Sequence, residues 1–150
     1  MSSAGFIIFD RSLDGEIKFL ILDTYPIVSK NRNFDIPKGM LDEGEDNLSG
    51  ALRELFEEVN LTQEDIIPFL DKDNNIVKIS PDLSPKLCLY LAKIKKKSIE
   101  NIKIKKNPET YNFEHSDIKF DNTNNCENLC LYYLKGIFKK SEDIIKNYEY

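Results

Sequence analysis

The stretch "PKGMLDEGEDNLSGALRELFEEVNL", residues 37–61, places five glutamates within twenty-five residues. Three of them, Glu54, Glu57 and Glu58, are spaced so that their side chains are neighbours when this part of the chain is helical. Like charges at that spacing destabilise a helix unless a positive group lies close by. The protein therefore has to supply, or bind, a positive partner for these carboxylates.

Residues 48–59 predict an amphipathic helix, because apolar side chains recur there with the helical period. The apolar face consists of Leu48, Leu52, Leu55 and Val59, with Ala51 and Phe56 on its flanks. The three glutamates fall on roughly the opposite side of the helix. Asn60 follows directly, and Asn is well suited to the left-handed cap that ends many helices.

The acidic face has two interpretations. One is a solvated surface, partly relieved by Arg53 at helical spacing from Glu57. That interpretation leaves unexplained the preceding loop, which contains Gly39 and adds Glu43 and Glu45. The other is a metal site, since Mg²⁺ takes oxygen ligands and commonly shares its shell with substrate phosphates. The crowding of carboxylates favours a metal-assisted phosphate site.

The same stretch resembles the Nudix box, Gly-x5-Glu-x7-Arg-Glu-U-x-Glu-Glu-x-Gly-U, in which U is a bulky apolar residue. The matching residues are Gly39, Glu45, Arg53, Glu54, Leu55, Glu57, Glu58 and Leu61. Asn60 stands in place of the last glycine, which a left-handed cap tolerates. The resemblance implies an α+β fold, an α/β/α sandwich of the Nudix type. Its mixed β-sheet would have the Nudix loop and helix on one side and a C-terminal helix packed on the sheet.

The resemblance also implies roles for the matching residues. Glu57 and Glu58 resemble the family's principal Mg²⁺ ligands, and the carbonyl group of Gly39 resembles a further ligand. Glu54 resembles the carboxylate that joins the metal shell or takes a proton from the attacking water. The implied reaction is attack of water on a nucleoside diphosphate linked to another group, with Mg²⁺, or Mn²⁺ as its substitute, lowering the pKa of the water.

Two residues of the box look structural as much as catalytic. Glu45 and Arg53 resemble the family's internal ion pair, which holds the loop against the helix. The resemblance also implies a catalytic role for Arg53. It implies a structural role for Asn60, at the end of the helix.

Two flanking stretches resemble diadenosine tetraphosphate hydrolases within the Nudix family. "NFDIPKG", residues 33–39, is similar to their entry sequence, and by that match Lys38 would contact phosphate. "PKLCLYLAKI", residues 85–94, is similar to their Pro-Lys-x-x-x-Tyr-x-Leu-Ala strand, so that Lys86 would bind phosphate and Tyr90 would line the nucleotide pocket. The plainer interpretations are two solvated lysines and a half-buried strand aromatic.

The chain's one histidine, His115, lies in "FEHSDIKF", residues 113–120. The diadenosine tetraphosphate hydrolases carry a similar Glu-His pair shortly before their final strand. By that match Glu114 would supply an extra carboxylate at the metals, as ligand or general base, and His115 would support substrate binding. A lone histidine is more often an ordinary surface residue, so that interpretation also stays open.

The implied substrate is diadenosine tetraphosphate, a small dinucleoside polyphosphate, cleaved asymmetrically to ATP and AMP. The alternative is an RNA 5′-end pyrophosphohydrolase or decapping enzyme, because residues 53–66 are also similar to the bacterial RNA-directed branch. The basic stretch "KIKKKSIENIKIKK", residues 93–106, could then hold RNA phosphates, although a solvated hairpin that protects a sheet edge is the plainer interpretation. A third interpretation, a non-catalytic ligand sensor, predicts a broken set of glutamates, whereas this set is complete.

Other apolar runs predict the rest of the fold. Strands are expected at residues 4–9, 16–24, 66–70, 76–79, 86–94 and 118–120, the first two as a hairpin, with a further strand around Ile99, Ile102 and Ile104. From about Asn125 the apolar spacing becomes helical, and Gly136 interrupts it before a second helical segment.

The length of 150 residues suits one domain, spanning residues 1–150. A net charge of -5 argues against broad nucleic-acid binding, and no apolar run reaches membrane-spanning length. The odd number of cysteines favours a reducing cytoplasm, with Cys126 and Cys130 as a buried thiol pair. A monomer or weak homodimer is expected, with any dimer contact through the C-terminal helices.

Overall fold

The computed structural model describes residues 2–24, 31–104 and 115–148. Its strands and helices are β1 (Ser3–Arg11), β2 (Ile17–Thr24), β3 (Phe34–Asp35), β4 (Lys38–Met40), α1 (Asn47–Val59), β5 (Ile66–Pro68), β6 (Lys78–Ile79), β7 (Leu87–Ile94), β8 (His115–Asn122), α2 (Thr123–Leu129) and α3 (Ile137–Tyr148). Three 3₁₀ turns add η1 (Gln63–Asp65), η2 (Lys96–Asn101) and η3 (Tyr132–Leu134). Within the described ranges, no helix combines the length and the apolarity needed to cross a membrane.

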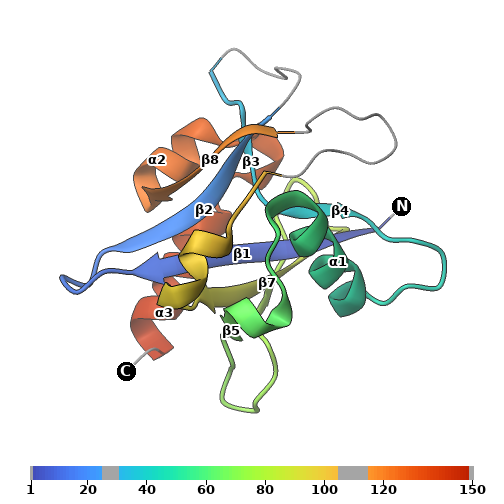
Figure 1. Ribbon diagram of the computed structural model, residues 1–150, viewed down its shortest axis with the longest axis horizontal. Coiled ribbons are helices and arrows are strands. Elements are labelled where there is room, and N and C mark those ends of the chain that lie inside the picture. The colour runs from blue at the N-terminus through green and yellow to red at the C-terminus, as the bar shows by residue number, and fades with distance from the viewer. Residues whose placement is uncertain (1, 25–30, 105–114, 149–150) are drawn as a thin grey trace.

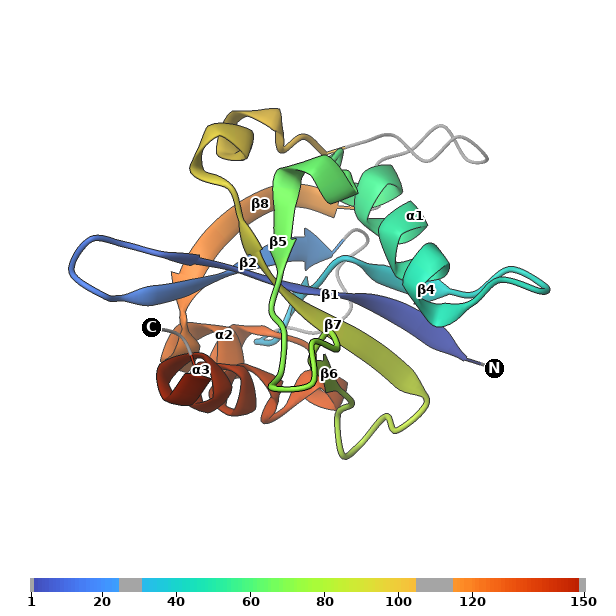
Figure 2. The same ribbon diagram turned by 90° about the horizontal axis from the view of Figure 1, so that it is seen from below.

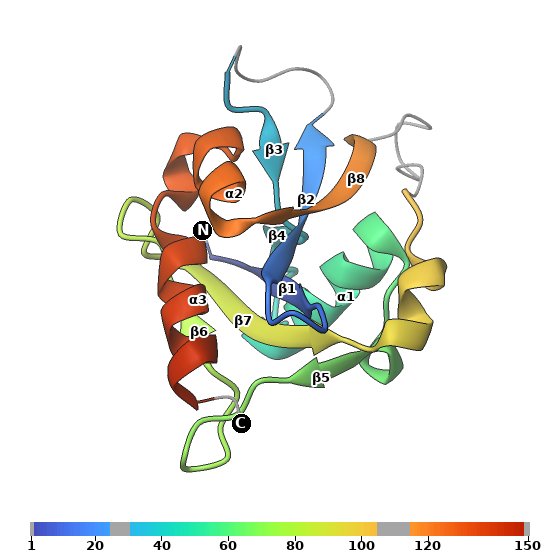
Figure 3. The ribbon, with the colours of Figure 1, turned by 90° about the vertical axis from the view of Figure 1, so that its left-hand side faces the viewer.

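The strands form one mixed sheet with helices on both faces (Figure 1). The main strand order is β3-β2-β1-β7-β5, with β8 on β2, β4 on β1 and β6 on β7. Among the strands of the described residues, β1 and β7 pair in parallel and the other pairs are antiparallel. Figure 3 shows α1 on one side of the sheet and α2 and α3 on the other. This architecture confirms the predicted α+β sandwich.

The entry to the acidic helix is built into the sheet between two central strands. β1 and β2 pair with each other only where residues 9–11 of β1 meet residues 17–19 of β2. Beyond that region β3 pairs with residues 22–23 of β2, while β4 pairs with residues 3–5 of β1. The connecting residues 36–37 therefore pass from one strand to the other across the gap that opens between them.

Gly5 lies where this inserted segment meets β1. The amide of Phe6 donates to the carbonyl oxygen of Pro37 at 3.0 Å. A Cβ on Gly5 would lie 2.3 Å from that same carbonyl oxygen and 2.5 Å from the Cβ of Lys38. The backbone of the inserted segment can therefore approach β1 this closely only because residue 5 has no side chain.

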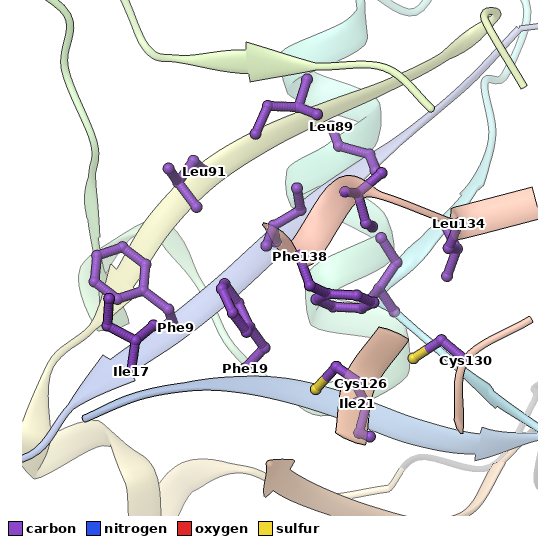
Figure 4. Close-up of a cluster of buried hydrophobic side chains, with 14 of the residues drawn as sticks. Phe9, Ile17, Phe19, Ile21, Leu89, Leu91, Cys126, Cys130, Leu134 and Phe138 are labelled. Atoms are coloured by element: carbon purple, nitrogen blue, oxygen red, sulfur yellow. The ribbon is translucent and has the colours of Figure 1, made fainter. Parts of the chain in front are cut away.

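Two apolar cores lie on the two faces of the sheet, as alternation along the strands requires. Figure 4 shows the first, between the sheet and α2 and α3, where the rings of Phe19 and Phe138 meet edge to face with centroids 5.3 Å apart. The second lies under α1 and includes Leu55 and Val59, both fully buried. Burial of a leucine side chain stabilises a fold by about 1.5–3 kcal/mol, so this face fixes α1 on the sheet.

Local signals set both ends of α1. The carboxylate of Asp46 caps the first turn by accepting the amide of Ser49 at 2.7 Å. Asn60 ends the helix with φ 66° and ψ 26°, which confirms the predicted left-handed cap.

The strand predicted around Ile99, Ile102 and Ile104 is wrong, and so is the hairpin predicted for the basic stretch. Its first part is the 3₁₀ turn η2, which Figure 2 shows as a short coil following β7. The amide of Lys103 donates to the carbonyl oxygen of Val59 at 3.0 Å, and the side chain of Asn60 donates to that of Asn101 at 3.0 Å. The backbone groups of this segment thus find partners at the helix end instead of at a sheet edge.

Two other predictions near the C-terminus hold in outline. The final strand is longer than residues 118–120, because β8 pairs with residues 18–24 of β2. Cys126 and Cys130 are buried free thiols, as predicted. Burial raises the pKa of Cys126 to about 12, so this thiol stays protonated and packs as an apolar side chain.

Gly5→Ala should destabilise the protein, although alanine suits a strand interior better than glycine does. The added methyl group meets backbone atoms that cannot move without displacing β4, and overpacking of this kind costs about 1–3 kcal/mol. Urea denaturation measures the free energy of unfolding. An unchanged or higher value would show that the inserted segment is not tightly packed on β1.

Candidate active site

The acidic face of α1 lies against the strand β4. The carboxylate of Glu58 accepts the backbone amide of Lys38 at 3.1 Å. The carboxylate of Glu54 lies against Gly39, where a Cβ would fall 2.2 Å from the carboxyl carbon of Glu54. Two of the three helical carboxylates therefore touch consecutive residues of β4. The third, Glu57, has a half-exposed side chain.

Arg53 ties the acidic loop to the helix. Its Nε and Nη2 atoms bind the two carboxylate oxygens of Glu45 at 2.9 and 3.0 Å, a bidentate pair. Nη2 also donates to the carbonyl oxygen of Met40 at 2.9 Å. The ion pair expected from the resemblance is thus present, and it holds both ends of the loop against α1.

The same guanidinium group is the positive partner of the crowded glutamates. Its Nη1 atom donates to Glu54 at 2.9 Å and to Glu57 at 3.1 Å. Asp42 adds a fourth carboxylate 3.3 Å from Nε. Hydrogen bonding to Glu45, followed by the charges of Glu54 and Glu57, raises the pKa of Arg53 further above its ordinary value. One guanidinium group therefore contacts four carboxylates.

The loop carboxylate of Glu45 is strongly perturbed by Arg53. Hydrogen bonding from Arg53 lowers the pKa of Glu45 from 4.5 to about 2, and the amide of Asp42 adds to the effect. Glu45 therefore remains ionised at any pH at which the protein works, as a permanent anchor for Arg53.

The donor chemistry of the site fits a divalent cation. Glu54, Glu57, Glu58 and the carbonyl group of Gly39 offer the oxygen ligands that Mg²⁺ prefers. In the described part of the chain, however, no three His, Cys, Asp or Glu side chains converge on a point that would hold a metal ion. Arg53 pairs with the carboxylates of both Glu54 and Glu57.

Two predicted phosphate contacts lie at the same end of the sheet as the acidic face. Lys38 belongs to β4, and its ammonium group lies 3.2 Å from Asp35. Lys86 is exposed and directly precedes β7. Ser3 of β1 pairs with Met40 on one side and with Leu87 on the other, so one strand separates the two lysines.

The other predicted substrate residues are placed less directly. Tyr90 is buried under α1, with its ring centroid 5.8 Å from that of Phe6, and burial raises the pKa of Tyr90 to about 12. That surrounding is typical of a core aromatic. His115 opens β8, where its backbone pairs with Thr24. Glu114 lies outside the described residues, so its role stays a prediction.

Sequence reasoning missed two residues that touch the site. Asp35 accepts the hydroxyl group of Tyr133 at 2.7 Å and also binds Lys38. The spacing of Asp35 and Lys38, three positions apart in "NFDIPKG", was a usable signal. Tyr133 lies 98 positions from its partner, and nothing local in the sequence marks it.

Comparison with known proteins identifies the family. The family model described as NUDIX domain matches residues 1–131. The chain belongs to the Nudix family. It is 40% identical over 67 residues to the asymmetrical bis(5′-nucleosyl)-tetraphosphatase of Caenorhabditis elegans, a match that spans 44% of this chain and 45% of that relative.

Solved structures agree with the fold of this Nudix chain. A binary complex of the C. elegans Ap4A hydrolase has a TM-score of 0.72 at 22% identity, covering 98% of this chain and 100% of that one. A second structure of the C. elegans Ap4A hydrolase has a TM-score of 0.62 at 25% identity, covering 97% of each chain. The NUDIX domain of Shewanella oneidensis NrtR with ADP ribose has a TM-score of 0.62 at 15% identity, covering 98% of this chain and 87% of that one. Identities this low carry the fold only.

The lowered pKa of Glu45 predicts how its contribution to stability depends on pH. A carboxylate whose folded-state pKa is depressed stabilises the fold above its unfolded pKa, and this contribution is lost as the pH falls through the folded value. Glu45→Gln should therefore melt below the wild type at neutral pH. The gap should narrow below about pH 4.5 and close near pH 2.

Thermal melts across this pH range test the prediction. Glu43→Gln, which alters an exposed glutamate two positions earlier, is the matched control and should follow the wild type throughout. A gap between Glu45→Gln and wild type that is the same at pH 2 and pH 7 would contradict an ion pair as its source.

Proposed function

We propose that this protein is a metal-dependent Nudix pyrophosphohydrolase that cleaves diadenosine tetraphosphate asymmetrically to ATP and AMP. The observation that carries the proposal is the contact of Glu54 and Glu58 with consecutive residues of β4, the strand that also carries Lys38. Phosphate ligands need a cation and a positive side chain at one place, and this arrangement supplies the donors for both. The partial match to the C. elegans tetraphosphatase supports the choice of substrate.

The metal ligands in this proposal are Glu54, Glu57, Glu58, Glu114 and the carbonyl group of Gly39. Bound Mg²⁺, or Mn²⁺ in its place, would neutralise charge on the polyphosphate and lower the pKa of the attacking water. The protein's own contribution is positional. Glu54, fixed against β4, is placed to accept a proton from water, and Glu58 is fixed by the amide of Lys38.

The remaining substrate contacts come from positive and aromatic side chains. Lys38 and Lys86 approach the phosphates from either side of β1, and each lysine acts as a point charge. Tyr90 and His115 are assigned to the nucleotide end. Arg53 holds the loop in register through Glu45 and keeps the carboxylate face assembled before the metal binds.

The proposal includes the setting of the enzyme. All three cysteines are free thiols, which suits a reducing cytoplasm. The chain acts as one domain over residues 1–150, as a monomer or a weak homodimer, on a small soluble substrate.

RNA 5′-end hydrolysis is the second candidate. The 3₁₀ turn η2 exposes lysines of the basic stretch, which could bind RNA phosphates. Lys96, however, is already paired with Asp10 at 2.8 Å and donates to the carbonyl oxygen of Arg11. This engagement favours the dinucleotide over RNA.

Product analysis by ion-exchange chromatography, with Mg²⁺ at mildly alkaline pH, tests the proposal. Diadenosine tetraphosphate and a 5′-triphosphorylated RNA are assayed in parallel. We expect ATP and AMP from the dinucleotide, faster than any release from the RNA. Phosphate or pyrophosphate from the RNA alone would move the function to 5′-end processing, with a steep salt dependence. No turnover of either, with binding retained, would favour a ligand sensor.

Glu57→Gln is the control that assigns the chemistry to the acidic face. It should abolish turnover while leaving the metal-free fold intact, because the Arg53–Glu57 pair is half exposed and pairs of this kind contribute about 0.3–0.5 kcal/mol. The metal-free melting temperature reports on the fold. A large drop in that temperature would mean that Glu57 is structural.

A further inference from the structure

The ammonium group of Lys38 is held by groups from two distant parts of the chain. It lies 3.2 Å from Asp35 and 5.3 Å from the ring centroid of Tyr133. Its side chain is only 23% exposed, so the direction of the ammonium group is restricted. Asp35 is in β3, whereas Tyr133 is in η3, next to the C-terminal helices.

Asp35 is a buried carboxylate whose two oxygens bind Tyr133, Ile36 and Lys38. One oxygen accepts the hydroxyl group of Tyr133 at 2.7 Å and the amide of Ile36 at 2.8 Å. The other oxygen faces Lys38. A buried carboxylate is stable only when paired and hydrogen-bonded, so these three partners fix its orientation.

Tyr133 is a permanent donor in this arrangement. Burial raises the pKa of Tyr133, and the negative charges of Asp35 and Glu58 raise it further. Its hydroxyl group therefore stays protonated at any working pH and always donates to Asp35.

Lys38 joins the two sets of residues. Its backbone amide donates to Glu58 at 3.1 Å, while its side chain pairs with Asp35. The ammonium group is thereby held between Asp35 and the ring of Tyr133 rather than in open solvent. A phosphate bound at those carboxylates would meet a lysine that is already oriented, which lowers the entropy lost on binding.

We propose that Asp35 and Tyr133 are positioning residues that orient Lys38 toward the substrate phosphates. Tyr133 fixes Asp35, and Asp35 fixes the ammonium group. The C-terminal segment of the chain thus contributes to the site without touching the substrate. This inference rests on the proposed function, in which Lys38 contacts phosphate.

Tyr133→Phe tests the inference because it removes one hydroxyl group and keeps the ring over Lys38. We expect the KM for diadenosine tetraphosphate to rise about fivefold with kcat within about twofold, the pattern of lost uniform binding. Tyr132→Phe is the matched control, since Tyr132 is exposed and its ring lies near Arg32 and Lys135 instead. Tyr133→Phe kinetics equal to those of Tyr132→Phe would overturn the inference.

A double-mutant cycle separates positioning from general support of the fold. In a Lys38→Ala background, Tyr133→Phe should change the KM no further, because the residue it acts through is gone. If the changes in KM caused by the two single substitutions multiply in the double variant, Tyr133 acts independently of Lys38, and the inference fails.

Lysine acylation by an N-hydroxysuccinimide ester, read residue by residue by mass spectrometry, needs neither substrate nor metal. Asp35→Asn keeps the shape of the side chain and removes its charge, so Lys38 should be acylated about fivefold faster while Lys86 is unchanged. Unchanged acylation of Lys38 would overturn the positioning claim. Faster acylation in a protein that hydrolyses neither substrate would support the claim and count against the proposed function alone.

Discussion

The site depends on one backbone constraint. β1 and β2 separate after a short paired region, and the segment from Phe34 to Met40 lies between them. Pairing with β2 places Asp35, and pairing with β1 places Lys38 and Gly39. Because both pairings use backbone hydrogen bonds in the middle of the sheet, this short segment is held more rigidly than a surface loop. Chemistry that needs fixed donors can be built on such a segment.

Within that frame, electrostatics divides the glutamates into two groups. Glu45 forms a bidentate pair with Arg53 and serves the fold. Glu54 and Glu57 share a single nitrogen of the same guanidinium group, and each receives one hydrogen bond from it. The shared group is the weaker attachment for each carboxylate, and an incoming divalent cation offers more charge. The arrangement thus stabilises the metal-free protein through a contact that a divalent cation could replace.

How far the sequence could predict this structure depended on the range of the interaction. The helical period of residues 48–59 and the cap at Asn60 follow from local spacing, and both are present. The pair of Glu45 and Arg53 was expected from the resemblance to the Nudix box, and it is present too. The isoleucines of the basic stretch look like a strand, yet their segment turns as η2 because the end of α1 offers it hydrogen-bond partners. Partners that lie far apart in sequence leave no periodic signal for a local pattern to reveal.

Because such distant partners matter, the acidic residues of the Nudix box do not by themselves define the site. A carboxylate face attracts cations but repels polyphosphates, so in the proposed function a positive side chain must assist binding. Lys38 follows the sheet crossing directly, and its own backbone amide binds Glu58. Its ammonium group, however, takes its direction from Asp35, and Asp35 from Tyr133. The carboxylates of α1 and the ammonium group of Lys38 are therefore positioned by different parts of the chain, and both parts meet at β4.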